Sequence, residues 1–467
     1  MSTVPDTHGP PAGATRPAGF VLAGMHGSSG KTVLTCLLLA AFEQRGLRVQ
    51  PFKAGPDYID PGYHNRYACR SSRNLDVWLM GRERLLDEAN RHTRTATGVL
   101  EGVMGLFDGA HPTSEEGSTM ELARWLGWPV VLSVPAAKAG RSLAAGLRGF
   151  LAEAAPDRIA GVVLVGVSGD SHAEYLREAL RPSGIPVLGA IPKLEALDWP
   201  ERHLGLQAAQ ERRLPSNADL AAIAESTLDL DAMVALAQIH PKPVLQPNGA
   251  PGVSEAPSAI QSPGANRARK VAIARDAAFH FYYEANLEWL MEQGAELLPF
   301  SPLLDQSVPR EAQAIVLGGG FPEVYAAALS HNTPILKSLR EAACDGIPCY
   351  AECGGLMLLS EELVSLDGGR FPMAGAIPGG VEMTRTLQNF GYCSVAQAGA
   401  PPARGHEFHH SRWTAEATHA NAWDAVRRRN GVARREGYRN RRLHASYVHL
   451  YFPALSPNLT SSLFLTP

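Results

Sequence analysis

Short apolar runs alternate with longer stretches of helical character along most of the chain. In the N-terminal half the runs read GFVLAG, GLRVQPFK, TGVLEGVMG, PVVLSVPA, IAGVVLVGV and PVLGAIP, and stretches such as TVLTCLLLAAFEQRG separate them. Buried strands of parallel sheets have this apolar character, and crossover helices connect them. We therefore predict an α/β protein whose N-terminal half is a mostly parallel sheet.

The alternation stops at residues 239–270, where Pro, Gly, Ser and Asn replace the apolar periodicity. It restarts with KVAIARD, ELLPFSP, AIVLGGG and IPCYAEC, so the C-terminal half is predicted to be a second α/β domain. We predict an N-terminal domain over residues 18–238, a linker over 239–270 and a C-terminal domain over 271–467. Residues 1–17 are polar and rich in Pro, Gly and Thr, and we expect a disordered leader there.

The composition narrows the class of function. With 45% hydrophobic and 19% charged residues, the 467-residue chain is ordinary for a globular protein, and no apolar run reaches the roughly 18 residues that cross a bilayer. Because residues 1–17 also lack the apolar core of a signal peptide, we expect a cytoplasmic protein that does not span a membrane. A formal charge of -3 gives no general attraction for nucleic acid, so we expect a small or medium-sized substrate.

The first apolar run leads into GMHGSSGKT, residues 24–32, directly before a long apolar helix. This is the setting of a phosphate-binding loop, because glycines let backbone N–H groups surround a phosphate and the helix N-terminus adds a favourable dipole. Lys31 is expected to neutralise phosphate charge, and the Thr32 hydroxyl to hold Mg²⁺. The loop residues are Gly27, Ser28, Ser29 and Gly30. Since the loop is one residue longer than the strict motif, a glycine-rich turn without nucleotide is the alternative.

Acidic residues follow the next strands at the same edge of the predicted sheet. PFKAGPDYIDPGYH places Lys53, Asp57 and Asp60 in a loop, and VLEGVMGLFDG ends a strand on Glu101 before Asp108. Carboxylates beside a phosphate loop are common Mg²⁺ ligands. For the two aspartates of the loop, an Asp-Pro turn with solvated charges is the alternative.

In the C-terminal half, IPCYAECGGLMLL places Cys353 between a buried strand and a glycine pair that opens an apolar helix. A tight strand-to-helix turn exposes a nucleophile, and the helix N-terminus favours the thiolate. The other five cysteines lack this setting. We therefore predict a reactive thiol at Cys353, against the alternative of a buried inert cysteine.

A cysteine nucleophile also needs oxyanion donors and a base. LGGGFPE supplies Gly319 and Gly320 at a second strand exit, and Gly354 follows the cysteine directly. HASYVHLYF offers His449 in a near-terminal strand, and the histidines of GHEFHHS compete with it. No acidic residue stands two positions after His449, so this pattern leaves a third, orienting group unidentified.

With both sites in view, the chain resembles the cobyrinate a,c-diamide synthase family over nearly its whole length from about residue 18. The matching segments, in family order, are PFKAGPDYIDPGYH, RNLDVWLMG, EGVMGLFDG, GSTMELARWLG, PERHLGL, FYYEANLE, LGGGFPE, AECGGLMLL, GHEFHHS and ASYVHLYF. The resemblance implies a P-loop-type, dethiobiotin-synthetase-like domain followed by a flavodoxin-like class I glutamine amidotransferase domain. It also implies the longer phosphate loop.

The resemblance further implies roles for individual residues. Positions that serve ATP and Mg²⁺ are matched by Lys31, Thr32, Asp60 and Glu101. Expected near the substrate carboxylate and its activated intermediate are Lys53, Asp57, Tyr58 and Asp108. The glutaminase pair is matched by Cys353 and His449, in a family that lacks the triad glutamate of other class I enzymes.

The implied reaction is amidation of the a and c acetates of cobyrinate, a tetrapyrrole polycarboxylate, with ATP, Mg²⁺ and glutamine. Two departures set the chain apart: Val165 replaces an Asn expected to read the adenine, and SVPAAKAG lacks the usual aspartate. They leave sirohydrochlorin or siroheme open as an alternative substrate. A nonenzymatic ATP-binding regulator and a transferase fed by free ammonia are alternatives of other classes, and a homodimer is one option for the assembly.

Overall fold

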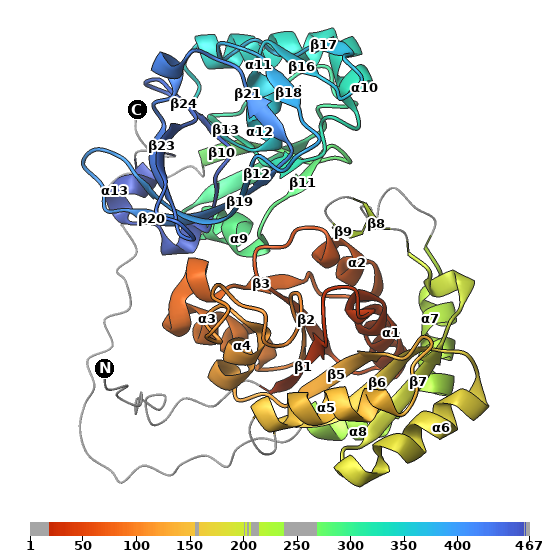
Figure 1. Cartoon of the computed structure of the whole chain (residues 1–467). Coiled ribbons are helices and arrows are strands. Elements are labelled where there is room, and N and C mark those ends of the chain that lie inside the picture. The colour runs from red at the N-terminus through yellow and green to blue at the C-terminus, as the bar shows by residue number, and fades with distance from the viewer. Residues whose placement is uncertain are drawn as a thin grey trace, which may run out of the picture. The chain divides into compact units, whose positions relative to one another are not determined.

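The computed structural model describes residues 18–154, 158–199, 201–202, 205–206, 214–237, 269–461 and 463. The chain divides into two compact units (Figure 1). Unit 1 is Met1–Val77 with Gly81–Ser258, and unit 2 is Trp78–Met80 with Ala259–Pro467. The predicted leader and nearly all of the predicted linker lie outside the described residues, and the first strand of unit 2 begins at Arg269.

Unit 1 is built on a seven-stranded sheet in the order β3-β2-β4-β1-β5-β6-β7, with every neighbouring pair parallel. Its strands are β1 (Gly19–Gly24), β2 (Val49–Ala54), β3 (Arg73–Leu75), β4 (Thr97–Glu101), β5 (Val130–Pro135), β6 (Ile159–Val167) and β7 (Val187–Pro192). The two-residue strands β8 (Glu201–Arg202) and β9 (Gly205–Leu206) pair with each other in an antiparallel arrangement. The predicted parallel sheet is confirmed.

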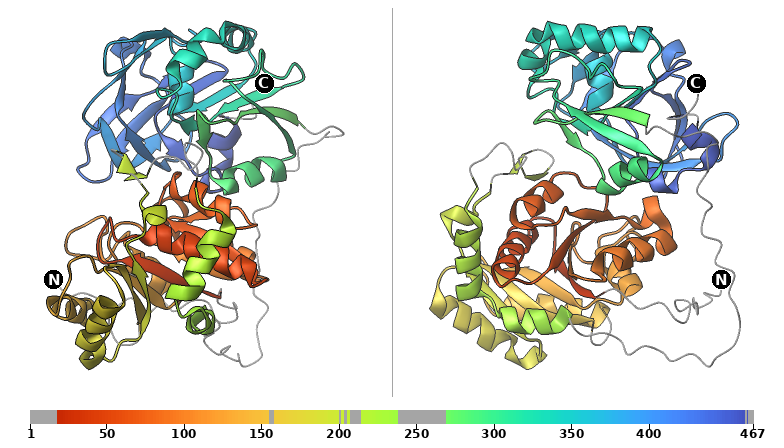
Figure 2. Two further views of the ribbon diagram at one scale, coloured as in Figure 1. Left: turned by 90° about the vertical axis from the view of Figure 1, so that its right-hand side faces the viewer. Right: turned by 180° about the vertical axis from the view of Figure 1, so that it is seen from behind.

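Helices lie on both faces of this sheet (Figures 1 and 2), which explains why its strands are apolar along their length. They are α1 (Lys31–Gln44), α2 (Asp60–Tyr67), α3 (Val77–Thr93), α4 (Thr119–Leu126), α5 (Ser142–Glu153), α6 (Asp170–Leu180), α7 (Asn217–Thr227) and α8 (Leu230–Ala237). Helix α1 is buried over most of its surface because α7, α8 and the sheet share one core with it. That packing fixes the start of α1 at the carboxyl end of β1.

The register of the sheet brings the predicted polar residues to one edge. In the pairing of β2 with β4, Lys53 lies directly opposite Glu101, and Glu101 is also the partner of Leu22 in β1. Since parallel strands end at the same edge of a sheet, the loops after β1, β2 and β4 converge there.

Unit 2 has a central six-stranded sheet in the order β12-β10-β13-β15-β25-β24, parallel except for β24. Its strands are β10 (Arg269–Ala274), β12 (Ala295–Phe300), β13 (Ala314–Leu317), β15 (Cys349–Glu352), β24 (Tyr438–Arg439) and β25 (Leu443–Ser446). A two-stranded ladder joins β11 (Phe279–Phe281) to β14 (Gly319–Gly320). The helices are α9 (Glu284–Glu292), α10 (Ala326–His331), α11 (Thr333–Cys344), α12 (Gly354–Leu359) and α13 (Pro457–Thr460).

Two further sheets extend unit 2. A five-stranded antiparallel sheet, in the order β23-β22-β19-β20-β26, contains β19 (Asn389–Ala396), β20 (Ala403–His409), β22 (Trp423–Arg427), β23 (Ala433–Glu436) and β26 (His449–Leu450). A four-stranded sheet contains β16 (Glu362–Val364), β17 (Arg370–Pro372), β18 (Val381–Met383) and β21 (Ser411–Trp413). The pattern of apolar runs predicted the parallel strands of unit 2 but not these additions.

The near-terminal strand expected over HASYVHLYF is wrong as a single element. The chain changes sheets within it, because β25 pairs with β15 whereas β26 pairs with β20. Side chains take the backbone donors at the change: the Tyr447 N–H donates to Glu436 Oε1 (2.8 Å), and the Val448 N–H to Ser446 Oγ (2.9 Å).

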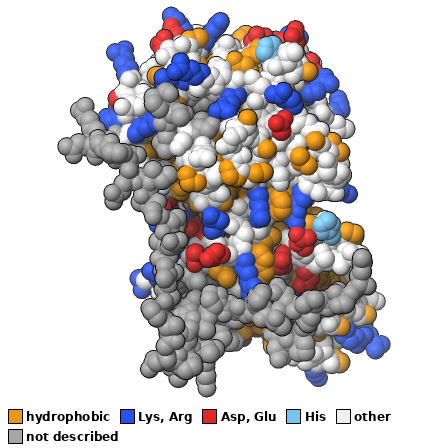
Figure 3. All heavy atoms as spheres, turned by 90° about the vertical axis from the view of Figure 1, so that its left-hand side faces the viewer, with side chains coloured by type: hydrophobic (Ala, Val, Ile, Leu, Met, Phe, Trp, Pro, Cys, Tyr) orange, Lys and Arg blue, Asp and Glu red, His pale blue; other side chains and the backbone are white. Residues whose placement is uncertain are grey.

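The surface and the helices bear on the expected setting of the protein. On the face drawn in Figure 3, the described Lys and Arg side chains are interspersed with acidic and apolar ones. None of the helices within the described ranges combines the length and the apolar character that a bilayer crossing requires.

Candidate active sites

The loop between β1 and α1 has the close backbone packing of a phosphate-binding turn. Gly30 has φ 73° and ψ 20°, and a Cβ there would lie 2.9 Å from Cγ1 of Val165. A Cβ on Gly24 would lie 2.9 Å from Cβ of Ser29 and 3.0 Å from Nζ of Lys31. Only glycine fits these two positions without a shift of the neighbouring atoms.

Inside the loop, short bonds set its shape. The Ser29 hydroxyl donates to the His26 carbonyl (2.7 Å), and the Ser133 hydroxyl at the end of β5 donates to the Ser29 carbonyl. Gly27 and Ser28 are exposed, whereas Ser29 is buried. The buried side of the loop is therefore anchored to the sheet, and the backbone of its other side is exposed.

Lys31 folds back over this loop. Its Nζ donates to the carbonyl oxygens of Gly27 (2.8 Å), Met104 (2.8 Å) and His26 (3.2 Å). Burial, with a contribution from the charge of Lys53, lowers the pKa of Lys31 to about 8. A phosphate oxygen is a stronger acceptor for this ammonium than the three carbonyls.

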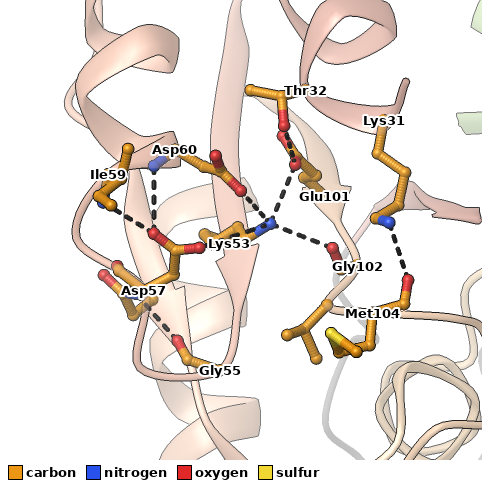
Figure 4. A network of polar contacts seen from close by, with 12 residues as sticks. Lys31, Thr32, Lys53, Gly55, Asp57, Ile59, Asp60, Glu101, Gly102 and Met104 are labelled. Atoms are coloured by element: carbon orange, nitrogen blue, oxygen red, sulfur yellow. Dashed lines mark hydrogen bonds and ion pairs between the residues drawn. The ribbon is translucent and has the colours of Figure 1, made fainter. Parts of the chain in front are cut away.

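Glu101 is the centre of the polar network at the sheet edge (Figure 4). Its Oε1 accepts from the Thr32 hydroxyl (2.7 Å) and from Lys53 Nζ (2.9 Å). Its Oε2 lies 2.7 Å from Nε2 of His64, whose Nδ1 lies 2.8 Å from the Ser72 hydroxyl. Burial raises the pKa of Glu101, but Lys53 and the hydrogen bond with His64 outweigh it and hold that pKa well below its ordinary value.

Lys53 joins the carboxylates to one another (Figure 4). Its Nζ lies 2.5 Å from Asp60 Oδ2, 2.9 Å from Glu101 Oε1 and 4.0 Å from Asp57 Oδ2. It also donates to the Gly102 carbonyl (3.1 Å). Burial lowers the pKa of Lys53, and the three carboxylates more than reverse this effect and raise the pKa well above its ordinary value. The structure thus places Lys53 between Asp60 and Glu101, two of the residues predicted for the metal.

The donors near Lys53 suit Mg²⁺. Asp60 and Glu101 supply carboxylate oxygens and Thr32 a hydroxyl, which are the hard ligands that Mg²⁺ prefers, and Mg²⁺ in phosphoryl-transfer sites usually takes one or two carboxylates together with phosphate oxygens and water. In the described part of the chain, no group of three or more His, Cys, Asp and Glu residues is arranged to hold a metal ion.

The residues predicted to lie near the substrate hold turns in the two loops beside this network. Asp57 Oδ1 accepts from the backbone N–H groups of Ile59 (2.7 Å) and Asp60 (3.1 Å). Tyr58 lies between Asp57 and Ile59 in the chain. Asp108 Oδ2 accepts from the Gly105 N–H (2.8 Å). Each aspartate thus uses one carboxylate oxygen to shape its loop.

In unit 2, Cys353 occupies a strained turn between β15 and α12. Its φ of 47° and ψ of -101° are unusual for a residue with a side chain, and such a backbone costs roughly 1–3 kcal/mol. The Cys353 N–H donates to the Ser446 carbonyl (2.7 Å), so β25 holds the turn in place. The predicted strand-to-helix turn at the cysteine is present in the structure.

His449 meets this cysteine from β26. Burial lowers the pKa of His449, but hydrogen bonds with Cys353 and Glu352 outweigh it and raise the pKa to about 10. Nδ1 of His449 lies 3.3 Å from Glu352 Oε2. The other oxygen of Glu352 accepts from the Tyr350 hydroxyl (2.5 Å) and from the Leu450 N–H (3.0 Å). Cys353 and His449 are thus brought together, with an acid that sequence reasoning missed.

The glycines predicted as oxyanion donors lie beside the same turn. A Cβ on Gly354 would lie 3.1 Å from the backbone N of Gly320 and 3.4 Å from the carbonyl carbon of Gly319. A Cβ on Gly319 would lie 2.7 Å from Cε1 of His449. The glycine strand β14 therefore lies against both the cysteine turn and the histidine.

The histidines of GHEFHHS are placed differently from His449. His406 stacks on His449 with ring centroids 4.9 Å apart, and its Nε2 lies 2.7 Å from the Tyr283 hydroxyl. Burial and the charge of His449 hold the pKa of His406 well below its ordinary value. His409 stacks on Tyr447, and its Nδ1 lies 2.8 Å from the Ser411 carbonyl oxygen. His406 therefore packs beside His449, and His409 lies in another network.

Two family models match different parts of the chain. Residues 20–206 match the model of the CobQ/CobB/MinD/ParA nucleotide binding domain, and residues 270–456 match that of the CobB/CobQ-like glutamine amidotransferase domain. Two relatives named cobyrinate a,c-diamide synthase, from Syntrophotalea carbinolica and Priestia megaterium, are 40% and 38% identical. Each alignment covers 93% of this chain, with 95% and 94% of the respective relative.

A third relative, from Streptomyces coelicolor, is named hydrogenobyrinate a,c-diamide synthase. It is 39% identical over 93% of this chain and 94% of its own length. Identity of this extent covers both units and both sites. The chain therefore belongs to the cobyrinate a,c-diamide synthase family and is a carbon–nitrogen ligase that uses glutamine as its amide donor.

Proposed function

We propose that this protein converts cobyrinate to its a,c-diamide, using ATP to activate each acetate carboxylate and glutamine to supply the nitrogen. The supporting observation is that one chain holds a phosphate loop with Lys31 beside a carboxylate network, and a strained Cys353 beside His449. The names and high coverage of the relatives support the substrate.

Activation must come first, because ammonia does not displace oxide from a carboxylate at a useful rate. In the proposed step, the substrate carboxylate attacks the γ-phosphorus of ATP, and ADP leaves an acyl phosphate behind. Lys31 and the backbone N–H groups of residues 27–32 hold the phosphates and neutralise charge as the bond to ADP breaks.

Thr32, Asp60 and Glu101 would hold Mg²⁺ during this transfer. When bound, Mg²⁺ neutralises charge on the phosphate oxygens. Lys53 balances the charge of the same carboxylates, and we assign Asp57, Tyr58 and Asp108 to the substrate side because their loops border the network.

Unit 2 generates the ammonia. The Cys353 thiolate attacks the side-chain amide carbon of glutamine, and the N–H groups of the glycine strand and Gly354 stabilise the oxyanion that forms. His449 donates a proton to the departing ammonia, which leaves a glutamyl thioester on the enzyme. Water then hydrolyses the thioester to glutamate, while ammonia attacks the acyl phosphate and releases phosphate.

Mass spectrometry of the product tests the substrate. Cobyrinate and hydrogenobyrinate are each incubated with enzyme, ATP, Mg²⁺ and glutamine. The favoured substrate of the two should gain two amides. Hydrogenobyrinate is the second candidate because the Streptomyces coelicolor relative carries its name. If neither compound gains an amide while sirohydrochlorin or siroheme does, the assignment of the substrate is wrong.

The Cys353→Ser variant tests the source of the nitrogen. It should lose glutamine-supported amidation and keep amidation supported by ammonium salt, because unit 1 is unchanged. Amidation with glutamine at the wild-type rate would contradict the role of Cys353.

A further inference from the structure

The acid beside the catalytic histidine comes from an unexpected place in the chain. No acidic residue stands two positions after His449, because that position is Tyr451. Glu352 instead directly precedes the nucleophile, and its Oε2 lies 3.3 Å from Nδ1 of His449. Glu352 and His449 are both nearly inaccessible to solvent, at 5% and 2% exposure.

The turn at Cys353 explains how two consecutive residues reach one ring. Successive side chains of a strand point to opposite faces, so a regular strand would send residues 352 and 353 apart. With φ at 47°, the backbone turns sharply after Glu352. As a result, Cys353 and Glu352 both hydrogen-bond His449, and Nδ1 is the ring nitrogen that faces Glu352.

We propose that Glu352 is the positioning carboxylate of the glutaminase, and that it orients His449 and stabilises its protonated ring by accepting a hydrogen bond from Nδ1–H. Nε2 is then the nitrogen that takes the proton from the Cys353 thiol and returns it to the leaving ammonia. This role deepens the proposed function and rests on it.

Glu352 is itself held with little freedom. Its Oε1 accepts from the Tyr350 hydroxyl (2.5 Å) and from the Leu450 N–H (3.0 Å). These two bonds hold the carboxylate in place, and with it the Oε2 atom that faces His449. Leu450 is the residue after His449, and one carboxylate therefore contacts the base, the backbone beside it and the strand of the nucleophile. A carboxylate with only a structural role would not need to face the imidazole.

The Glu352→Gln variant is the direct test. The Gln carbonyl can keep the bonds from Tyr350 and Leu450, and its NH₂ then faces Nδ1 of His449, which forces that nitrogen to accept. Nε2 then carries the hydrogen and cannot take a proton from the thiol. We expect kcat for glutamine hydrolysis to fall on the order of 100-fold or more, with KM within about threefold of wild type.

Three companion measurements separate positioning from folding. Amidation supported by ammonium salt should stay within about twofold of wild type in Glu352→Gln, since the phosphate site is untouched. Glu352→Asp should recover part of the lost kcat because it restores a carboxylate. Glu436→Gln is the matched control, because Glu436 is also a buried carboxylate of unit 2. Glu436 accepts from Ser446 Oγ (2.5 Å) and the Tyr447 N–H (2.8 Å) and not from His449. The kcat of this variant for glutamine hydrolysis should stay within about twofold of wild type.

A kcat for Glu352→Gln within about threefold of wild type overturns the role of Glu352. If Glu352→Gln loses glutamine-supported and ammonia-supported amidation together, the Tyr350→Phe variant is the deciding test. It removes one bond to Glu352, and kcat for glutamine should fall about 3- to 10-fold, the rate equivalent of one hydrogen bond. An unchanged kcat in Tyr350→Phe then overturns the proposal.

The Cys353→Ser variant, run in parallel, keeps the two ideas apart. Glutamine-supported amidation that survives in Cys353→Ser contradicts the proposed function itself. If Cys353→Ser is inactive with glutamine and Glu352→Gln matches wild type, only the role of Glu352 fails.

Discussion

Gly319 leaves no room for a side chain beside His449, since a Cβ on Gly319 would lie 2.7 Å from Cε1 of the imidazole. We therefore expect Gly319→Ala to displace the ring from Cys353 and to lower kcat for glutamine hydrolysis about 10-fold or more. Ammonia-supported amidation should be unchanged. The control is Gly149→Ala in α5, where no atom lies within 4 Å of the added Cβ. Equal kcat values for both variants would contradict a contact that matters for catalysis.

Backbone strain at Cys353 predicts a trade between stability and activity. Glycine adopts a φ of 47° with little strain, whereas any side chain is strained there. We expect Cys353→Gly to be about 1 kcal/mol more stable than Cys353→Ala, with both variants inactive towards glutamine. Chemical denaturation of the two proteins measures this difference, and a less stable glycine variant would refute the strain.

The pKa of Glu436 predicts how stability changes with pH. Burial, with the charge of Glu407, raises this pKa from 4.5 to about 7. Between these values the folded state holds a proton that the unfolded chain has released, so stability falls as the pH rises across this interval. Glu436→Gln has no such proton. The Tm of wild type minus that of the variant should therefore decrease from about pH 5 to about pH 8, and a constant difference would contradict this linkage.

Lys53 predicts a metal-dependent stability. Lys53→Ala leaves Asp57, Asp60 and Glu101 without their shared cation, which should cost about 3–5 kcal/mol. Because the same oxygens suit Mg²⁺, the ion should raise the Tm of Lys53→Ala more than that of wild type. Lys337→Ala is the control, since Lys337 is exposed and pairs with Glu341 at 3.6 Å. Identical responses of all three proteins to Mg²⁺ would argue against a metal site at Asp60 and Glu101.

Local sequence patterns predicted strands of the two mostly parallel sheets and the turns at the two sites. Most parallel strands follow from apolar runs, although β3, with the sequence RNL, does not. The two turns, at Gly30 and Cys353, follow from glycines placed between a strand and a helix. Pairing between distant segments was harder to predict. HASYVHLYF looked like one strand because its residues are apolar or β-forming, and only the acceptors Glu436 and Ser446 reveal where it changes sheets.

Two polar side chains of the sites were missed for the same reason. Glu352 lies at the end of an apolar run and directly before Cys353, far in the chain from the His449 ring that it faces. His64 closes PFKAGPDYIDPGYH, and nothing in its local sequence shows that it reaches Glu101. A charged or polar residue at a fully buried strand end was the available signal for Glu352.

The position of strand β26 sets the distance between His449 and the pair Glu352 and Cys353. Glu352 and Cys353 are neighbours in the chain, so a single peptide unit sets their spacing, whereas His449 arrives on a two-residue strand. That strand is held by β20 and by Asn286, whose side chain donates to the Leu450 carbonyl (2.8 Å) and accepts from the Phe452 N–H (2.8 Å). A shift of β26 by the length of one hydrogen bond would separate His449 from Cys353 and stop glutamine hydrolysis. Amidation with free ammonia would continue.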